Sequence, residues 1–330
     1  MSGVKLPILG LLLLSAATLT VAGQRAVGPV TRDAAPVFSS GVDMVTVNVS
    51  VRDPRGRIVR GLACRDFRLV DSGFGRPIRS VFESDAPLRI AVLLDMSGSM
   101  AIDGNIARAR RAVRTVVGAL QSGRDEAALF TFDSALREIV PFTRDLERFD
   151  ALDLAGRPYG RTSLYDAVAD TAALVGRSGD RHGALLVVTD GVDTGSRRTV
   201  EEVSGVASAI AVQVHLLTVG GALDRRDGPG GAGGSGSAAL SATLADLASW
   251  TGGSVRATGT EEDMLEAVGE LLPGLRYQYV VMFRPGFRRG WHPIELQTLD
   301  DRLAVHARRG YVAGRAKLDR RPAARERPCE

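Results

Sequence analysis

The sequence predicts an α/β fold with a doubly wound, mostly parallel sheet, and additional β structure at both ends of the chain. The apolar run 90–94 (IAVLL) lacks polar alternation, as is typical of a strand buried on both faces. From residue 88 onward, further apolar runs alternate with helical patterns, which favours parallel strands joined by crossover helices. Over 45–52, valine alternates with polar residues, which is the pattern of a strand with one buried face.

The central region, 87–273, carries the α/β pattern. Ile106, Val113 and Leu120 fall on one face of a predicted helix, and arginines lie largely off that face, where solvent would cover them. The other expected helices are 145–152, 163–175, 200–211, 240–250 and 261–272, and the expected strands are 90–94, 127–132, 136–142, 184–189, 214–219 and 254–257. Residues 220–237 are mostly glycine and form either a mobile lid or a flexible insertion.

The flanking regions 42–86 and 274–313 predict β structure only. Each contains about three short strands separated by turns, which is too few to close a core. We therefore expect the two regions to combine into one small β-sandwich-like domain, with the α/β domain inserted between them. The expected strands are 45–52, 67–70, 78–82, 277–283, 293–299 and 303–307.

The N-terminus predicts an exported protein. Lys5 precedes a leucine-rich segment that ends in small residues, so 1–23 has the layout of a secretory signal peptide, and 24–41 the composition of a linker. The apolar stretch approaches spanning length, which leaves an uncleaved membrane anchor as the alternative. We expect cleavage, no transmembrane helix after it, and a secreted or periplasmic (cell-envelope) location.

The charge distribution argues against nucleic-acid binding. The 330-residue chain has a formal net charge of +4, and the tail 314–330 holds six basic and three acidic residues. The remaining chain is therefore close to neutral and shows no basic face with interleaved aromatic residues. The tail itself is predicted to be a disordered basic segment.

The two cysteines are predicted to be free thiols. Cys64 lies in a probable folded region and Cys329 in the tail. One widely separated pair is neither a disulfide framework nor a metal-ligand spacing. We expect two unpaired thiols.

The end of the buried strand at 90–94 presents a concentration of oxygen atoms. Asp95, Ser97 and Ser99 follow the strand directly, and Gly98 allows the backbone to curl so that their side chains converge. Open α/β sheets bind ligands at the carboxyl ends of their strands. Carboxylate and hydroxyl oxygens suit a hard divalent cation such as Mg²⁺.

The segment DMSGSM (95–100) resembles the DxSxS motif of the von Willebrand factor type A (VWFA) domain, whose metal-ion-dependent adhesion site also takes a Thr and an Asp from two later loops. Both are found in order, as Thr162 in GRTSLYD and as Asp190 after the strand at 184–189. The flanking segments VTVNVSVRDPRGRIVRGLACRDFRLVDSG, LRYQYVVMFRPG and ARRGYVA resemble secreted bacterial VWFA-related proteins. The resemblance implies a site for Mg²⁺, or another divalent cation such as Mn²⁺ or Ca²⁺, held by Asp95, Ser97, Ser99, Thr162 and Asp190.

Neutral hydroxyl ligands would leave the cation with much of its charge, so it would attract an acidic residue of a protein partner. The sequence therefore predicts an exported, metal-dependent, adhesion-type interaction module and not an enzyme. Arg161 beside Thr162 would either compete for the partner's carboxylate or add to its capture. Asp166 and Asp193 lie nearby but fit helix-cap and turn positions, so neither is expected to be a ligand.

Two alternatives remain. In one, the metal site is structural and the β domain binds the partner. In the other, the protein is a hydrolase in which Ser97 or Ser99 acts with Asp190 and with His182 or His215. The hydrolase is disfavoured because Ser97 lacks the flanking glycines of a nucleophile elbow, and because His182 is expected at the end of its strand opposite the metal site.

Overall fold

The computed structural model describes residues 44–150, 152, 156–176, 181–191, 193–209, 212–220, 244–286, 290–313 and 329. The predictions for the signal peptide, the linker, the glycine-rich segment after residue 220 and the tail other than Cys329 lie outside these residues. Within the described ranges, no helix is both long and apolar enough to cross a membrane.

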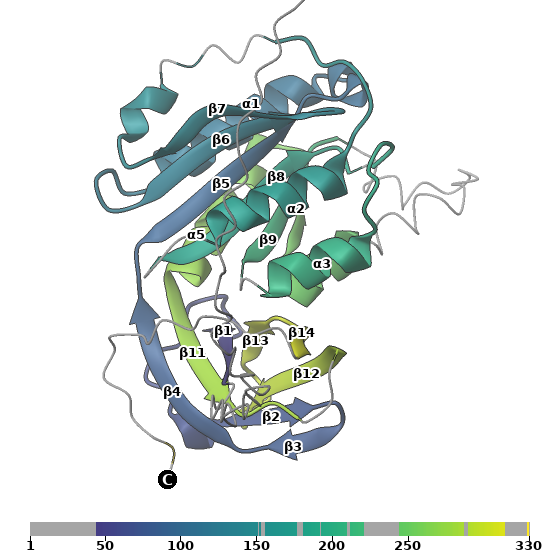
Figure 1. Cartoon of the computed structure of the whole chain (residues 1–330). Helices are drawn as coiled ribbons and strands as arrows, with labels where there is room; N and C mark the ends of the chain where they lie inside the picture. Colours follow the sequence, from purple (N-terminus) through teal and green to yellow (C-terminus); the bar gives the residue numbers. More distant parts are fainter. Residues whose placement is uncertain are drawn as a thin grey trace, which may run out of the picture. The chain divides into compact units, whose positions relative to one another are not determined.

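The central element is a six-stranded sheet with the strand order β10-β9-β8-β5-β6-β7. Figure 1 labels the strands of this sheet from β9 to β7. Every neighbouring pair is parallel except β6 and β7, which pair antiparallel at one edge. The mixed α/β fold with a mostly parallel sheet is therefore confirmed. The strands are β5 (Leu88–Asp95), β6 (Glu126–Phe132), β7 (Leu136–Thr143), β8 (His182–Thr189), β9 (Gln213–Thr218) and β10 (Val255–Ala257).

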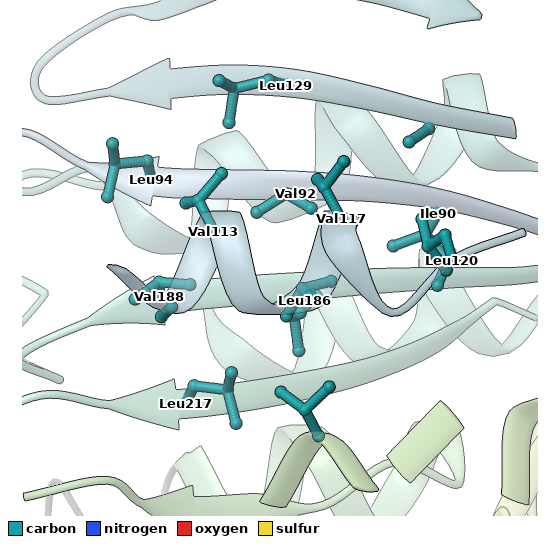
Figure 2. Close-up of a cluster of buried hydrophobic side chains, with 14 of the residues drawn as sticks. Ile90, Val92, Leu94, Val113, Val117, Leu120, Leu129, Leu186, Val188 and Leu217 are labelled. Carbon is teal, nitrogen blue, oxygen red and sulfur yellow. The ribbon is translucent and has the colours of Figure 1, made fainter. Parts of the chain in front are cut away.

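Helices cover both faces of this sheet, which explains the uninterrupted apolar run of β5. Ile90, Val92 and Leu94 share a buried cluster with α1 and α5, and Figure 2 shows Val113 and Val117 of α1 packed over them. Ala91 and Leu93 face the opposite cluster, which includes α2, α3 and the helical segment 244–251. Neither face can be polar when both are buried. The helices are α1 (Asn105–Gly118), α2 (Leu164–Val175), α3 (Val200–Ala209) and α5 (Glu261–Arg276).

Strands from the two ends of the described chain build two further antiparallel sheets, in the orders β13-β1-β11-β4 and β14-β12-β2-β3. In the first sheet β1 lies between β11 and β13, so early and late strands pair directly. Val47, Val49, Leu69, Tyr279 and Phe283 meet in one core shared by both sheets. The predicted combination of N- and C-terminal strands is therefore confirmed. The strands are β1 (Val45–Arg52), β2 (Phe67–Asp71), β3 (Phe74–Arg76), β4 (Ile78–Asp85), β11 (Tyr277–Phe283), β12 (Gly290–Thr298), β13 (Ala304–Ala307) and β14 (Gly310–Ala313).

Two helix boundaries differ from the prediction. In place of a helix over 145–152 there is one 3₁₀ turn, η3 (Leu146–Phe149), because only its first and last residues are buried and a single turn places both inward. Helix α5 runs to Arg276 and passes through Pro273, beyond the predicted end at residue 272. Leu275 is buried in the core, so tertiary packing outweighs the cost of a proline near the end of a helix.

The prediction of two free thiols is wrong, because Cys64 and Cys329 form a disulfide, with their Cα atoms 5.7 Å apart. The amide of Cys329 also donates to the carbonyl oxygen of Arg79 in β4, at 3.0 Å. Cys64 begins the 3₁₀ turn η1 (Cys64–Asp66). The pairing depends on where the end of the chain lies against β4, and a sequence separation of 265 residues gives no indication of that position.

Candidate metal centre

Three loops meet at the carboxyl-terminal edge of the six-stranded sheet. Leu94 of β5 pairs with Val188 of β8, so these two parallel strands end at the same level. Asp95 is the last residue of β5, and Asp190 follows the last residue of β8. The topology therefore places both acidic residues on one edge of the sheet.

The carboxylate of Asp95 organises its own loop. Its Oδ1 accepts the backbone N–H of Ser97 at 2.8 Å, and its Oδ2 accepts the hydroxyl of Thr189 at 2.6 Å. The hydroxyl oxygens of Ser97 and Ser99 lie 3.1 Å apart. Asp95 and Ser97 are buried. Three of the five predicted ligands are thus held together by direct hydrogen bonds.

The loop that carries Thr162 is attached to the Ser97 loop through backbone hydrogen bonds. The amide of Gly98 donates to the carbonyl oxygen of Gly160 at 3.0 Å, and the amide of Tyr159 donates to that of Met96 at 2.8 Å. A Cβ at position 98 would lie 3.4 Å from the Gly160 oxygen, which is an ordinary van der Waals contact, so the two loops pack closely at this point. Thr162 is buried, and within the described part of the chain its hydroxyl has no hydrogen bond to the other four residues.

The two carboxylates at this edge are buried. Asp190 Oδ1 has no hydrogen-bond partner among the described residues, and no ion pair there involves Asp95 or Asp190. Burial raises the pKa of Asp95 to about 6; hydrogen bonds from Thr189 and Ser97 oppose this, and the charge of Asp190 adds to it. A buried carboxylate oxygen without a partner in the described residues, on the same sheet edge as Asp95 and the hydroxyls of Ser97 and Ser99, has the chemistry of a ligand for a hard divalent cation.

The chemistry of this set differs from that of a conventional acidic metal cluster. No group of three or more His, Cys, Asp or Glu side chains forms a possible metal site in the described ranges. A cation held here would have two carboxylates, Asp95 and Asp190, and would otherwise depend on the hydroxyls of serine and threonine.

Thr189 belongs to this centre and was missed by the sequence analysis. It receives a hydrogen bond from the amide of Gly191 at 3.1 Å while its hydroxyl donates to Asp95. The signal for it is a lone hydroxyl residue at the end of an apolar strand, directly before Asp190.

The neighbouring polar residues have other partners. Asp193 accepts the amide of Leu164 at 2.8 Å, at the beginning of α2, and the hydroxyl of Ser196 at 2.6 Å. Asp166 accepts two amides of the segment before α3. The exposed side chain of Arg161 donates to the carbonyl oxygen of Thr194. Both carboxylates are thus engaged by backbone N–H groups.

The geometry does not form the Ser-His-Asp arrangement of the hydrolase alternative. His182 pairs with Leu88 at the other end of β8, and its two ring nitrogens lie 2.9 Å from the oxygens of Leu275 and Ser84. His215 lies opposite Leu186, within β9, and its Nδ1 contacts Ser254. Neither imidazole is positioned to take a proton from Ser97 or Ser99.

Comparisons with known proteins identify one family. The family model described as "VWA domain containing CoxE-like protein" matches residues 65–237. No curated protein matches the chain.

Several solved structures resemble the chain at low identity. The conserved hypothetical protein BatB from Bacteroides thetaiotaomicron is 18% identical, with a TM-score of 0.39 over 56% of this chain and 96% of that one. The von Willebrand factor type A protein from Catenulispora acidiphila is 11% identical, with a TM-score of 0.44 over 84% and 76%. The manganese-loaded TRAP protein of Plasmodium vivax is 14% identical, with a TM-score of 0.38 over 69% and 97%.

The family model identifies the family of this chain. The match includes β5 and the loops that carry Asp95, Thr162 and Asp190, and it extends over more than half of the 330 residues. The chain therefore belongs to the VWA family described as VWA domain containing CoxE-like proteins.

Proposed function

We propose that the protein is an exported, metal-dependent interaction module that captures an acidic residue of a partner protein, and that it is not an enzyme. The proposed ligands of a Mg²⁺-type cation are Asp95, Ser97, Ser99, Thr162 and Asp190. The observation that carries the proposal is the buried Asp190 Oδ1, which has no hydrogen-bond partner among the described residues and lies on the same edge of the sheet as a second buried carboxylate, Asp95.

The residues of the proposed site have two roles, which are to orient the loop and to bind the cation. Asp95 fixes the loop through its bonds to Ser97 and Thr189, so the serine hydroxyls are oriented before any ion arrives. When bound, the cation would supply a positively charged coordination position for a carboxylate of the partner. Hydroxyl ligands are neutral and would leave most of that charge available.

The surroundings of the centre are suited to a protein partner. Tyr159 is 83% exposed, on the loop hydrogen bonded to Met96, and Ile102 is 58% exposed, directly after the Ser99 turn. Arg161 is exposed next to Thr162. Exposed aromatic and arginine side chains around a polar centre are typical of interface hot spots. We propose that these three side chains contact the partner around its metal-bound carboxylate.

Export is supported by two independent features. The predicted signal peptide, 1–23, is one of them. The disulfide between Cys64 and Cys329 is the other, because disulfides persist in oxidising compartments outside the cytosol. We also propose that the domain boundaries are those expected from the sequence, with the VWA domain at 87–273 and the second domain formed by 42–86 and 274–313.

Isothermal titration of the full chain with MgCl₂, MnCl₂ and CaCl₂ tests the metal site. We expect saturable binding by the wild type and its loss in Asp190→Asn and Ser97→Ala. Asp170→Asn is the matched control, because Asp170 is an exposed carboxylate that pairs with Arg198 outside the centre. Equal binding by all four proteins would contradict the proposal.

Partner chemistry is tested on an array of peptides that carry Asp or Glu, each paired with its Asn or Gln counterpart. Metal-dependent retention of acidic peptides alone is the expected result. Retention that persists in EDTA and in Ser97→Ala would instead favour binding through another surface, such as the β sandwich. Hydrolysis of ester or phosphoester substrates that Ser97→Ala abolishes would contradict the non-enzymatic assignment.

A further inference from the structure

A second polar cavity lies away from the metal centre, where β9 and β10 approach α5 and the strands β1 and β13. The cavity has a volume of about 50 Å³, and a cavity needs about 10–15 Å³ to hold one water molecule. We propose that this cavity binds one small oxyanion of the phosphate or sulfate type. The polar residues that line it include Ser50, Arg52, His215, Arg256, Glu270 and His306.

His215 supplies a buried hydrogen-bond donor that has no acceptor. The amide of Ser254 donates to its Nδ1 at 3.1 Å, so Nδ1 acts as an acceptor. Burial lowers the pKa of His215 to about 3, with His306 and Arg256 adding to the shift, so the imidazole is neutral. Its single proton must then be on Nε2. Nε2 is buried without a partner in the described chain, and His215 is only 7% exposed.

The charges around this donor favour an anion. Arg52 donates to the carbonyl oxygens of Gly56, at 2.5 Å, and of Glu270, and no carboxylate in the described ranges pairs with its guanidinium. Arg256 pairs with the carboxylate of Glu270 at 2.7 Å. Glu270 is the one acidic residue among the described residues that line the cavity. Two guanidinium groups against one carboxylate leave one positive charge in excess, which an oxyanion would neutralise.

A glycine keeps this space open. A Cβ at position 274 of α5 would lie 2.9 Å from Arg52 Nη2 and 3.7 Å from the Ser50 hydroxyl. Alanine has the higher helix propensity, so the helix itself gains nothing from glycine at this position. The small residue therefore preserves the space next to the guanidinium. A single oxyanion there could accept hydrogen bonds from the His215 Nε2–H and from the guanidinium at the same time.

The test is isothermal titration of the full chain with sodium phosphate and sodium sulfate, against sodium chloride at equal ionic strength. We expect saturable binding to the wild type, weakened by about tenfold or more in Arg52→Gln, because a charge-assisted hydrogen bond is lost. Gly274→Ala should weaken binding as well, because it fills the space beside Arg52. Arg68→Gln, in the exposed part of β2, is the matched control and should bind as the wild type does.

Absence of saturable binding to the wild type would overturn the proposal. Equal binding by wild type, Arg52→Gln and Gly274→Ala would do the same, because the anion would then be elsewhere. Sulfate stabilises proteins in general by exclusion from their surface, so a rise in melting temperature shared by all variants also counts against the site. If Arg52→Gln fails to fold, the anion affinity of Gly274→Ala still tests the proposal.

Discussion

Replacing Asp95 with asparagine should stabilise the metal-free protein at neutral pH. The native Asp95 carboxyl has a pKa of about 6, against 3.8 for an ordinary aspartate, chiefly because it is buried. A difference of about two pKa units corresponds to about 3 kcal/mol of unfavourable free energy for the ionised native form. Asparagine is nearly isosteric and can still accept the Ser97 amide, so much of that penalty should disappear.

The raised pKa of Asp95 determines how the stability of the wild type depends on pH. Between pH 3.8 and about 6 the native state holds a proton on Asp95 that the unfolded chain has released. Stability therefore falls as pH rises through this interval and is then constant above it. The advantage of Asp95→Asn should be greatest above pH 7 and should shrink toward pH 4.5.

Melting temperatures measured by thermal unfolding in EDTA and in MgCl₂ test this prediction. We expect Asp95→Asn to melt several degrees above the wild type in EDTA at pH 7.5 and to gain nothing from Mg²⁺. Asp125→Asn is the matched control, because Asp125 is equally buried but bound by both guanidinium nitrogens of Arg276, at 3.0 and 2.6 Å, so it should lose stability. An Asp95→Asn protein that is less stable than the wild type in EDTA at pH 7.5 would refute the reasoning.

Three further predictions concern other parts of the molecule. Cys64→Ser should lose roughly 2–5 kcal/mol of stability, and a reductant should lower the wild-type melting temperature to a similar extent; a wild type insensitive to reductant would contradict the disulfide. Arg276→Met should cost about 3–5 kcal/mol in urea unfolding, because it leaves Asp125 buried without a cation. Burial raises the pKa of Asp125, but hydrogen bonds and the charge of Arg276 outweigh it, so the native pKa is lower than that of an ordinary aspartate. The stability that this ionised carboxylate contributes above pH 4 is therefore lost as the pH falls through the native pKa. In Arg276→Met this loss of stability at acidic pH should be smaller. Arg161→Ala should weaken binding of an acidic peptide by about threefold to tenfold without changing affinity for Mg²⁺, both measured by titration; unchanged peptide affinity would place Arg161 outside the interface.

Periodicity predicted most of the fold, since it reports burial directly. The apolar run of β5 is buried on both faces, and the alternation of β1 places Val47, Val49 and Val51 in the core of the sandwich. Short strands without a strong pattern were missed. Phe74–Arg76 and Gly310–Ala313 are held in place by pairing with β2 and β12, not by their own sequence.

Features set by long-range contacts could not be predicted in this way. The Cys64 and Cys329 sulfur atoms meet because β4 holds the end of the chain, and the ion pair of Asp125 with Arg276 joins residues 151 positions apart. Thr189 illustrates the same limit at the candidate site. From the sequence alone, a threonine in a buried strand is interpreted as a β-branched core residue. Its hydrogen bond to Asp95 depends on the neighbouring strand β5, which the sequence around Thr189 does not indicate.

The contrast between Asp95 and Asp125 bears on the proposed role of the candidate metal centre. Both carboxylates are fully buried, but Asp125 has a guanidinium and two backbone N–H groups as partners, while the hydrogen-bond partners of Asp95 are uncharged: the amide and hydroxyl of Ser97 and the hydroxyl of Thr189. A chain selected for stability alone would neutralise both. An uncompensated charge retained on a sheet edge with a second orphaned carboxylate costs native stability, and a ligand of opposite charge would recover that cost on binding. Cation affinity and the stability of the folded state should therefore rise together.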